Sequence, residues 1–353
     1  MQSTAGVTIQ QVAEAAGVSA STVSNLLNGR AHRMQPETRR RIEKAIDRLG
    51  YRPNRAARQL RTGRTQTVGL VVPSVGNPFW GAFALHLESA ALAEGYHVLL
   101  CNSERDPERE RQYIDELWSD GIRGVILCSS LPSLEHLRPL IDRGLQLVAF
   151  DRIAQADDPE TLVSISIDNT VGAQLATNHL LELGHRRLAF VSGALGSINR
   201  KHRYRGFVDA LERAGLTADD ATVWSGGGAT EQFGDVAAAE LGRTAARELL
   251  TRDDPPTGIV AINDMCALGV CRGIRDLGRR VANDVSVVGF DDIVLADLAD
   301  PPLTTVRQPS AELAASAFAE LKRRIEDPGS AKGRSLLVRP ELVVRESTAP
   351  PPR

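Results

Sequence analysis

The stretch TIQQVAEAAGVSASTVSNLLNG, residues 8–29, predicts two short helices joined by a tight turn. Thr8 and the glutamine three positions on form a capping-box pattern, and the apolar residues that follow recur at helical spacing. Gly17 can adopt the left-handed conformation that ends a helix, and Ser19 can cap the next one. A third helix is predicted over residues 36–49. We therefore expect a small three-helix unit with one shared core.

The second helix of this unit carries the first functional signal. Its apolar residues, which include Val23, are expected to face the core. The outward face then consists of small and polar side chains: Ala20, Ser21, Ser24 and Asn25. Short side chains allow a helix backbone to approach base edges in the major groove, and an Asn side chain can bond an adenine edge through two hydrogen bonds. The pattern predicts a DNA-reading helix.

Charge is distributed unevenly along the chain. Residues 1–66 hold 12 Lys and Arg against 4 Asp and Glu, a net charge of +8, so the remainder of a chain with net charge −2 carries −10.

The stretch RPNRAARQLRTGRT, residues 52–65, is too short for a stable isolated helix, and we expect it to fold on DNA. Leu60 would then be a wedge in the minor groove, with Arg55 and Arg58 on phosphates. The alternative is a solvated basic linker.

Composition excludes several classes of protein. The 353 residues are 42% hydrophobic, with no apolar run long enough to span a membrane and no amino-terminal signal-peptide pattern, so we expect a cytoplasmic protein with no membrane partner. The four cysteines lack metal-ligand spacing and are expected to be free thiols. The seven histidines are scattered, and neither a nucleophile elbow nor a phosphate-binding loop occurs. We expect no enzyme activity, no catalytic residues, no metal and no cofactor.

From residue 67 onward, β-branched runs alternate with helical patterns, which is typical of βαβ units. The strand candidates are VGLVVP, HVLLC, GVILC, LVAFD, LAFVSG, TVWSG, GIVAIN and VSVVGFD. These exceed what one sheet usually holds, and the pattern restarts after a polar stretch at residues 154–161. We therefore expect two parallel sheets, with a ligand cleft beyond the carboxyl ends of their strands.

Polar and aromatic residues follow several of the predicted strands or begin the next helix. They are Ser74, Asn77, Phe79, Asp151, Arg152, Arg203, Asn263 and Asp291. Asp, Asn and Arg side chains can bond vicinal hydroxyl groups in pairs, and an aromatic face can cover the apolar side of a sugar ring. The set predicts a site for a sugar or another polyol. Each residue alone could equally be a helix cap or a turn former.

The motifs together resemble the lactose-repressor (LacI/GalR) family of bacterial transcription regulators. The resemblance runs through residues 8–348 and includes NPFW, FDR, SIDNTVGAQLATNHLLELGHRRLAFVSG, RYRGF, AINDMCALG, VSVVGFDDI, PPLTTVRQP and LVRPELVVREST. It implies DNA contacts from a set that also includes Thr8, Ser19, Asn28 and Ala57. It also implies that the effector cleft is lined by Asn77, Phe79, Asp151, Arg203, Asn263 and Asp291. Asn25 stands where relatives usually have Arg, so their base preference is not carried over.

The resemblance implies a helix-turn-helix headpiece with a hinge helix, followed by a two-lobed, doubly wound α/β domain like the periplasmic binding proteins. We expect the headpiece at 1–53, the hinge at 54–66 and the effector-binding and dimerisation domain at 67–349. Within that domain, the first lobe is expected at about 67–167 and 309–333, and the second at about 168–308 and 334–349.

The expected function is control of transcription by a repressor that binds double-stranded operator DNA under the control of a small-molecule effector, a sugar or related polyol. No leucine heptad follows Val344, so we expect a homodimer, and the tail STAPPPR has a composition typical of disorder. Two alternatives stay open at this point. One is a regulator of the same architecture that answers to no small molecule, and the other is a sugar-binding protein or sugar-active enzyme of the same two-lobed shape.

Overall fold

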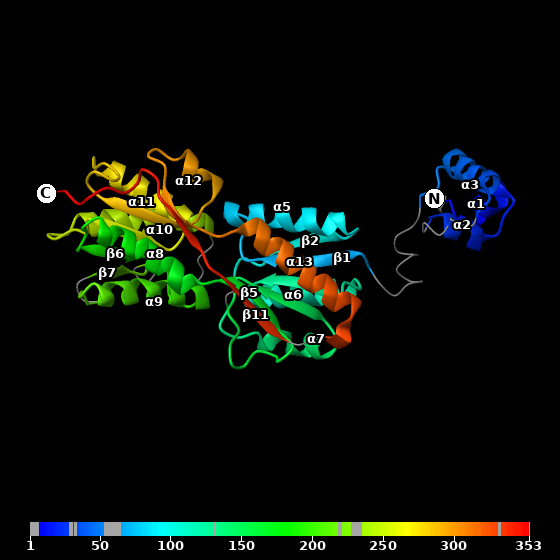
Figure 1. Cartoon of the computed structure of the whole chain (residues 1–353), viewed down its shortest axis with the longest axis horizontal. Helices are drawn as coiled ribbons and strands as arrows, with labels where there is room; N and C mark the ends of the chain where they lie inside the picture. The colour runs from blue at the N-terminus through cyan, green and yellow to red at the C-terminus, as the bar shows by residue number, and fades with distance from the viewer. Residues whose placement is uncertain are drawn as a thin grey trace, which may run out of the picture. The chain divides into compact units, whose positions relative to one another are not determined.

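The chain forms two compact units, Met1–Thr65 (unit 1) and Gln66–Arg353 (unit 2) (Figure 1). The computed structural model describes residues 7–27, 31, 34–52, 65–129, 131–217, 221–226, 235–330 and 333–352. Each unit encloses apolar cores of its own.

Unit 1 has the three helices that the sequence predicts. They are α1 (Ile9–Ala16), α2 (Ala20–Leu27) and α3 (Pro36–Leu49). The capping box is confirmed, because Thr8 Oγ1 accepts from the Gln11 amide at 3.3 Å while the Thr8 amide donates to Gln11 Oε1 at 2.8 Å. Gly17 ends α1 with φ 63°, and Ser19 Oγ accepts from the amide of Thr22 at 3.2 Å. These caps fix the turn that sets α2 against the core.

The first sheet of unit 2 has parallel strands in the order β11-β5-β4-β3-β1-β2. The strands are β1 (Thr67–Val72), β2 (His97–Asn102), β3 (Gly124–Cys128), β4 (Gln146–Phe150), β5 (Val163–Ile167) and β11 (Arg334–Val338). One face packs on α5 (Pro78–Ala93) and α13 (Ser310–Glu326); the other packs on α6 (Pro107–Ser119), η1 (Glu135–Leu137) and α7 (Arg138–Asp142). This two-sided burial explains why the strands read as continuous apolar runs.

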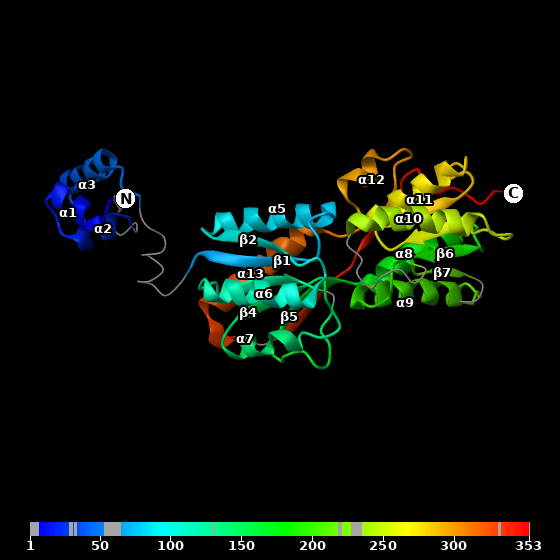
Figure 2. The ribbon, with the colours of Figure 1, turned by 180° about the vertical axis from the view of Figure 1, so that it is seen from behind.

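The second sheet has the order β12-β10-β9-β8-β6-β7 and is parallel except for β12, which pairs antiparallel with β10. Its strands are β6 (Leu188–Val191), β7 (Thr222–Trp224), β8 (Gly258–Ala261), β9 (Ser286–Asp291), β10 (Thr304–Arg307) and β12 (Glu341–Val343). Its helices are α8 (Asn169–Glu182), α9 (Ile198–Arg213), α10 (Asp235–Leu250), α11 (Asp264–Asp276) and α12 (Val294–Leu298). Figure 2 shows the two lobes from behind. The predicted two-sheet α/β fold is confirmed.

One predicted lobe boundary is wrong. Residues 334–338 were expected in the second lobe, but they form β11 in the first sheet, parallel to β5. After α13 the chain is still in the first lobe, where β5 would otherwise be an edge strand with unpaired backbone groups. The last crossing between the lobes therefore comes after β11, at residues 339–340.

The tail is also ordered where its composition predicted disorder. Ser347 Oγ donates to the Val287 carbonyl at 2.6 Å, and the Ala349 amide donates to Ser286 Oγ at 3.0 Å. The buried His185 side chain lies 2.9 Å from the Ala349 carbonyl oxygen. Hydrogen bonds to the second sheet, which composition does not reveal, therefore hold this segment.

Helices α10 and α11 approach closely because glycines line their contact. A Cβ on Gly269 would lie 1.8 Å from the carbonyl oxygen of Ala239, and one on Gly242 would lie 2.0 Å from that of Cys266. Added atoms at these positions must push the two helix backbones apart.

We therefore expect Gly269→Ala to lower the free energy of unfolding by about 1–3 kcal/mol or more, as overpacked cores do. Urea unfolding followed by circular dichroism measures the change. Arg272→Ala, at an exposed position of the same helix, should change it by less than about 0.5 kcal/mol. Equal effects of the two substitutions would contradict the close-packing account.

Candidate functional site

Two adjoining pockets lie between the lobes of unit 2, beyond the carboxyl ends of strands from both sheets. The empty space at the first is about 490 Å³ and at the second about 920 Å³, open solvent included. Arg105, Ser197 and Arg200 line both of them. The first is lined in addition by Asp151, Gly193, Asn199, Arg203, Ala238, Leu241, Ile262 and Asn263, and the second by Pro73, Ser103, Glu110, Cys128, Ser129, Leu131, Ala194 and Gly196.

Asp151 follows β4 and carries its side chain into the first pocket. Its backbone has φ 56°, a left-handed conformation that is strained for a residue other than glycine. The Asn199 Nδ2 of the other lobe donates to the backbone oxygen of Asp151 at 2.8 Å. Within the described part of the chain, Asp151 Oδ1 and Asn199 Oδ1 are buried without a hydrogen-bond partner. Both atoms can accept from a ligand.

Burial raises the pKa of Asp151 to about 7, with the Arg203 guanidinium opposing the rise and the Asp291 carboxylate adding to it. Burial also raises the pKa of Asp264 to about 7, with Asp291 again adding to the rise, although the Thr305 hydroxyl donates to Asp264 at 2.5 Å. A carboxyl group with a raised pKa in a cleft, as at Asp151, is typical of ligand sites, whereas Asp264 is fully buried and lines neither pocket.

Arg203 makes several polar contacts in the cleft. Its Nε donates to Asn169 Oδ1 at 2.7 Å, and its Nη1 donates to the carbonyl oxygen of Ile262 at 2.5 Å. Its guanidinium carbon lies 3.5 Å from the centroid of the Phe290 ring, and its Nη2 lies 3.9 Å from Asp291 Oδ1. These contacts compensate the burial of a charge and fix the first turns of α9 at the ends of β8 and β9.

Asp291 connects the two lobes at the edge of the first pocket. It has φ 124° and accepts from Gln308 Nε2 at 2.7 Å. Asn77, at the amino end of α5 in the first lobe, donates from Nδ2 to Asp291 Oδ2 at 3.3 Å and caps its own helix by accepting from the Phe79 amide at 3.0 Å. The two predicted residues therefore lie together, although neither lines either pocket.

The remaining predicted ligand-binding residues divide into two groups. Asn263 lines the first pocket, where its Oδ1 caps α11 by accepting from the Cys266 amide at 2.9 Å. Ser74 and Phe79 are buried and line neither pocket. The Phe79 ring packs edge-on against Trp80 at 5.0 Å, and its stacking on a sugar ring stays a prediction.

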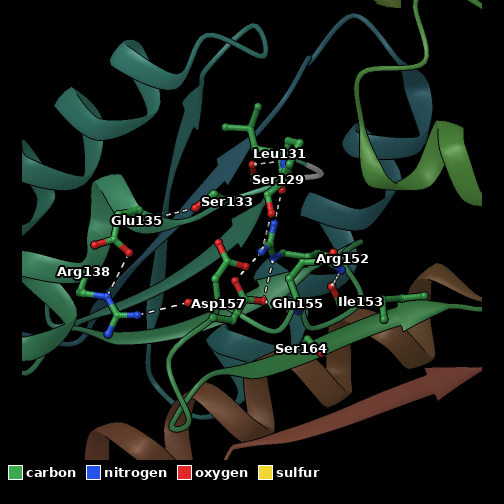
Figure 3. Close-up of polar contacts among 12 residues, drawn as sticks. Ser129, Leu131, Ser133, Glu135, Arg138, Arg152, Ile153, Gln155, Asp157 and Ser164 are labelled. Atoms are coloured by element: carbon green, nitrogen blue, oxygen red, sulfur yellow. Dashed lines mark hydrogen bonds and ion pairs between the residues drawn. The ribbon is translucent and has the colours of Figure 1, made fainter.

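Arg152 is not brought into the cleft, contrary to the prediction. Its side chain is fully buried and ion-paired with Asp158, and it donates to the backbone oxygens of Leu131 and Pro132 (Figure 3). Although it adjoins Asp151 in sequence, it serves a different purpose. It fixes Leu131, which lines the second pocket, against the loop that follows β4.

Sequence reasoning missed Arg105, Ser197, Asn199, Arg200 and Gln308. The rule that found Asp151 applies to most of them as well, because Arg105 follows β2 and residues 197–200 follow β6. Gln308 directly follows β10, a strand that was not predicted.

The second candidate site is the outer face of α2 in unit 1. Ser21 and Asn25 are exposed, Ala20 and Ser24 are half-buried, and Val23 faces the core. Thr8 and Ser19 cap the two helices that form the turn. Exposed basic residues on α3 accompany this face: Arg39, Arg40, Arg41, Lys44 and Arg48. The predicted contacts Asn28, Arg55, Ala57, Arg58 and Leu60, and with them the hinge helix, lie outside the described residues.

Two kinds of feature do not occur among the described residues. None of the helices there is long and apolar enough to cross a membrane. No group of three or more His, Cys, Asp or Glu among them could hold a metal ion.

Comparisons with known proteins match both units. Residues 8–54 match the family model for bacterial regulatory proteins of the lacI family, and residues 177–348 match that for a periplasmic binding protein-like domain. The HTH-type transcriptional regulator DegA of Bacillus subtilis is 34% identical over 343 residues, which are 97% of this chain and 98% of DegA.

Solved structures agree with these matches. The lac repressor dimer bound to operator and the anti-inducer ONPF has a TM-score of 0.84 at 28% identity, covering 98% of this chain and 99% of that one. The transcriptional regulator CelR in complex with cellobiose has a TM-score of 0.69 at 31% identity, covering 97% and 99%.

The buried Arg152–Asp158 pair gives a test of the corrected role of Arg152. Arg152→Met should lower the free energy of unfolding by about 3–5 kcal/mol, because it leaves a carboxylate buried without its partner. The double substitution Arg152→Met, Asp158→Leu should recover part of that loss. Arg138→Met, which breaks the exposed pair with Glu135 (Figure 3), should cost less than about 1 kcal/mol. An Arg152→Met protein as stable as the unmodified chain would contradict this role.

The raised pKa of Asp151 predicts a pH dependence. Because the pKa is about 7 in the folded chain and about 3.9 in an unfolded one, the folded state binds the proton more tightly. The contribution of Asp151 to stability is therefore largest below pH 4 and falls as the pH rises to about 7, by at most about 1.4 kcal/mol per pH unit.

Asp151→Asn should remove that decline. Relative to the unmodified chain, the variant should gain stability from pH 4.5 to pH 8 in urea unfolding, whereas Asp253→Asn, at an exposed position, should not. A difference between Asp151→Asn and the unmodified chain that is independent of pH would contradict the prediction.

Proposed function

The chain belongs to the lacI family of bacterial regulatory proteins and is a DNA-binding transcriptional regulator, and on that premise we propose that it represses transcription as a homodimer on operator DNA. A sugar or related polyol bound in the cleft of unit 2 sets its operator affinity. The proposal places the protein in the cytoplasm, where operator DNA is. It rests on one observation. The same chain carries an exposed polar face on α2 and a cleft in unit 2 where, among the described residues, Asp151 and Asn199 have buried oxygen atoms without a hydrogen-bond partner.

The DNA-binding part is supported by the build of α2. Its two exposed polar side chains, Ser21 and Asn25, are one helical turn apart and so lie on one face. The opposite face is anchored by Val23, which is fully buried. A short helix held this way can enter a major groove without reorganising its core, while the basic residues of α3 are available to contact phosphates.

The ligand-binding part is supported by the chemistry of the first pocket. Asp151 and Asn199 offer acceptors from opposite lobes, so one hydroxylated ligand can bond both lobes together. A ligand that stabilises one lobe arrangement more than another shifts the population toward it, which is how a cleft ligand can control a separate DNA-binding unit. The solved relative with cellobiose supports a sugar as the ligand class.

The dimer is supported by an apolar surface along one edge of unit 2. Leu85 and Leu92 of α5 are 64% and 53% exposed, and Val294 and Leu298 of α12 are 67% and 72% exposed. The edge strand β2 adds two half-exposed leucines. Both views show α5 and α12 on the same long edge (Figures 1 and 2). Exposed apolar surface of this extent is typical of an interface, and the lac repressor neighbour is a dimer.

Substitution of Asn25 tests the reading face. With operators selected from a random duplex library, Asn25→Ala should weaken operator binding by about 5-fold to 150-fold, the worth of one bidentate base contact, and relax selection at one base pair. Binding to random-sequence DNA should stay unchanged. The matched control is Glu14→Gln on the exposed side of α1, which should leave the ratio of specific to non-specific affinity as it is. Equal loss on both kinds of DNA would refute the base-reading role.

Charge placed on the apolar edge tests the dimer. Leu92→Glu combined with Leu298→Glu should raise the dimer dissociation constant at least about 10-fold, because two like charges would face each other across a two-fold interface. Analytical ultracentrifugation distinguishes the 38.1 kDa monomer from the dimer. Leu337→Glu, at an exposed position of β11 in the first sheet, is the control and should leave the dimer intact. A monomeric unmodified chain, or a dimer indifferent to the double substitution, would contradict the assignment.

A further inference from the structure

Each of the two pockets has polar groups of its own. Asp151 and Asn199, whose Oδ1 atoms are buried without a partner in the described part of the chain, line the first pocket and not the second. Glu110 and Ser129 line the second pocket and not the first. The pockets adjoin, because Ser197 lines both. A ligand confined to one pocket therefore leaves the polar groups of the other without it.

Glu110 brings a carboxyl group to the second pocket. It lies in the first turn of α6, and its side chain is only 3% exposed. Its Oε1 lies 2.9 Å from Nε2 of His136. Among the described residues, no hydrogen bond or ion pair engages its Oε2. An acceptor in so buried a side chain is costly unless it is satisfied, so Oε2 is available to a hydroxyl group of a ligand.

Ser129 adds a hydroxyl group to the same pocket. Its Oγ accepts from the Leu131 amide at 3.4 Å, which leaves the hydroxyl proton to be donated elsewhere (Figure 3). The Leu131 carbonyl in turn accepts from the buried Arg152, which holds this loop from below. Bonds within the protein therefore fix the wall of the second pocket in advance, which lowers the cost of ordering it around a ligand.

The rest of the second pocket combines small and apolar residues with these polar groups. The small and apolar residues of its lining are Pro73, Leu131, Ala194 and Gly196. Small-molecule sites commonly have such a lining, with a few placed polar groups on a mostly apolar wall. A sugar ring presents both kinds of surface, since its hydroxyl groups surround two faces of C–H groups. The second pocket therefore suits a sugar ring as well as the first does.

We propose that the cleft ligand is a sugar of two linked rings, with one ring on Asp151 and Asn199 in the first pocket and the other on Glu110 and Ser129 in the second. The inference rests on the proposed function and adds the ligand's size to it. A monosaccharide bonds the polar groups of one pocket only, whereas two linked rings bond both sets. The linkage between the rings passes Ser197, where the pockets meet.

Sugars that share a ring test the proposal. Full-length protein is titrated by calorimetry with glucose, maltose and cellobiose, and with galactose, lactose and melibiose. We expect at least one two-ring sugar to bind roughly 10-fold to 100-fold more tightly than either of its component monosaccharides, because the second ring adds a hydrogen bond to a carboxyl group. The methyl glycosides of glucose and galactose are the controls for the loss of a free anomeric hydroxyl group.

A side chain at Gly196 distinguishes the two pockets. Gly196 has no positive φ, and among the described residues a Cβ there would lie more than 4 Å from every atom beyond its chain neighbours. Gly196→Phe should therefore be tolerated and fill part of the second pocket, which Gly196 lines. It should weaken binding of the two-ring sugar at least about 10-fold and leave that of the monosaccharide within about 2-fold. Gly196→Ala is the control, because a methyl group is too small to fill the pocket.

Polar substitutions then assign the contacts of each ring. Ser129→Ala should weaken binding of the two-ring sugar by about 3-fold to 10-fold, and Glu110→Gln by about 10-fold, with little effect on the monosaccharide. Asn199→Ala, in the first pocket, should weaken binding of both sugars. Because Glu110→Gln also changes the contact with His136, its stability is measured by urea unfolding, and Ser129→Ala tests the second pocket independently.

The outcomes separate this inference from the function on which it rests. A monosaccharide or methyl glycoside that binds as tightly as every two-ring sugar containing it overturns the two-ring ligand and leaves sugar control intact. Equal losses of affinity for both sizes of sugar in Gly196→Phe also overturn it. If no sugar of either size binds, sugar control itself fails, and the inference fails with it.

Discussion

The cleft depends on the burial of one guanidinium, that of Arg203. A buried charge is tolerated only when its donors are satisfied, and here Asn169, the Ile262 carbonyl and the Phe290 ring satisfy it. These partners lie at the start of α8 and the ends of β8 and β9, so the arginine ties α9 to three neighbouring elements. Asn199 lies one turn earlier on the same helix and is thereby directed at Asp151 of the other lobe. A single buried cation thus sets the geometry of a site that both lobes share.

Side-chain hydrogen bonds join the two lobes directly at the cleft. Asn199 bonds the backbone of Asp151, and Asn77 bonds Asp291; each pair joins a residue of one lobe to a residue of the other. The described chain also crosses between the lobes three times, after β5, after β10 and after β11, and multiple crossings of this kind form a hinge. A ligand that donates to the unpartnered acceptors of both lobes adds those bonds only in an arrangement that brings Asp151 and Asn199 together. The free energy available for regulation is therefore the difference in ligand affinity between the two arrangements.

The parts of this molecule that local rules govern could be predicted from its sequence. The caps Thr8 and Ser19 depend on immediate neighbours, and the rule that ligands gather beyond parallel strand ends located Asp151, Arg203 and Asn263. Features that depend on contacts between residues far apart in the sequence could not be predicted. Arg152 adjoins Asp151 but is held by Asp158 and the Leu131 loop, and β11 joins the first sheet only because β5 needs a partner. The tail is fixed by Ser286 and His185, which lie far away in the sequence.

Coupling between the cleft and operator DNA is the central claim, and thermodynamic reciprocity tests it most directly. The affinity of a cleft ligand is measured by calorimetry for the free protein and for the protein saturated with operator, and the operator affinity is measured with and without saturating ligand. Linkage requires the two ratios to be equal, and the account predicts a common factor of about 5 to 150 in either direction. A factor of one, with both ligand and operator bound tightly, would show that the cleft and the DNA-binding unit are independent and would contradict the account.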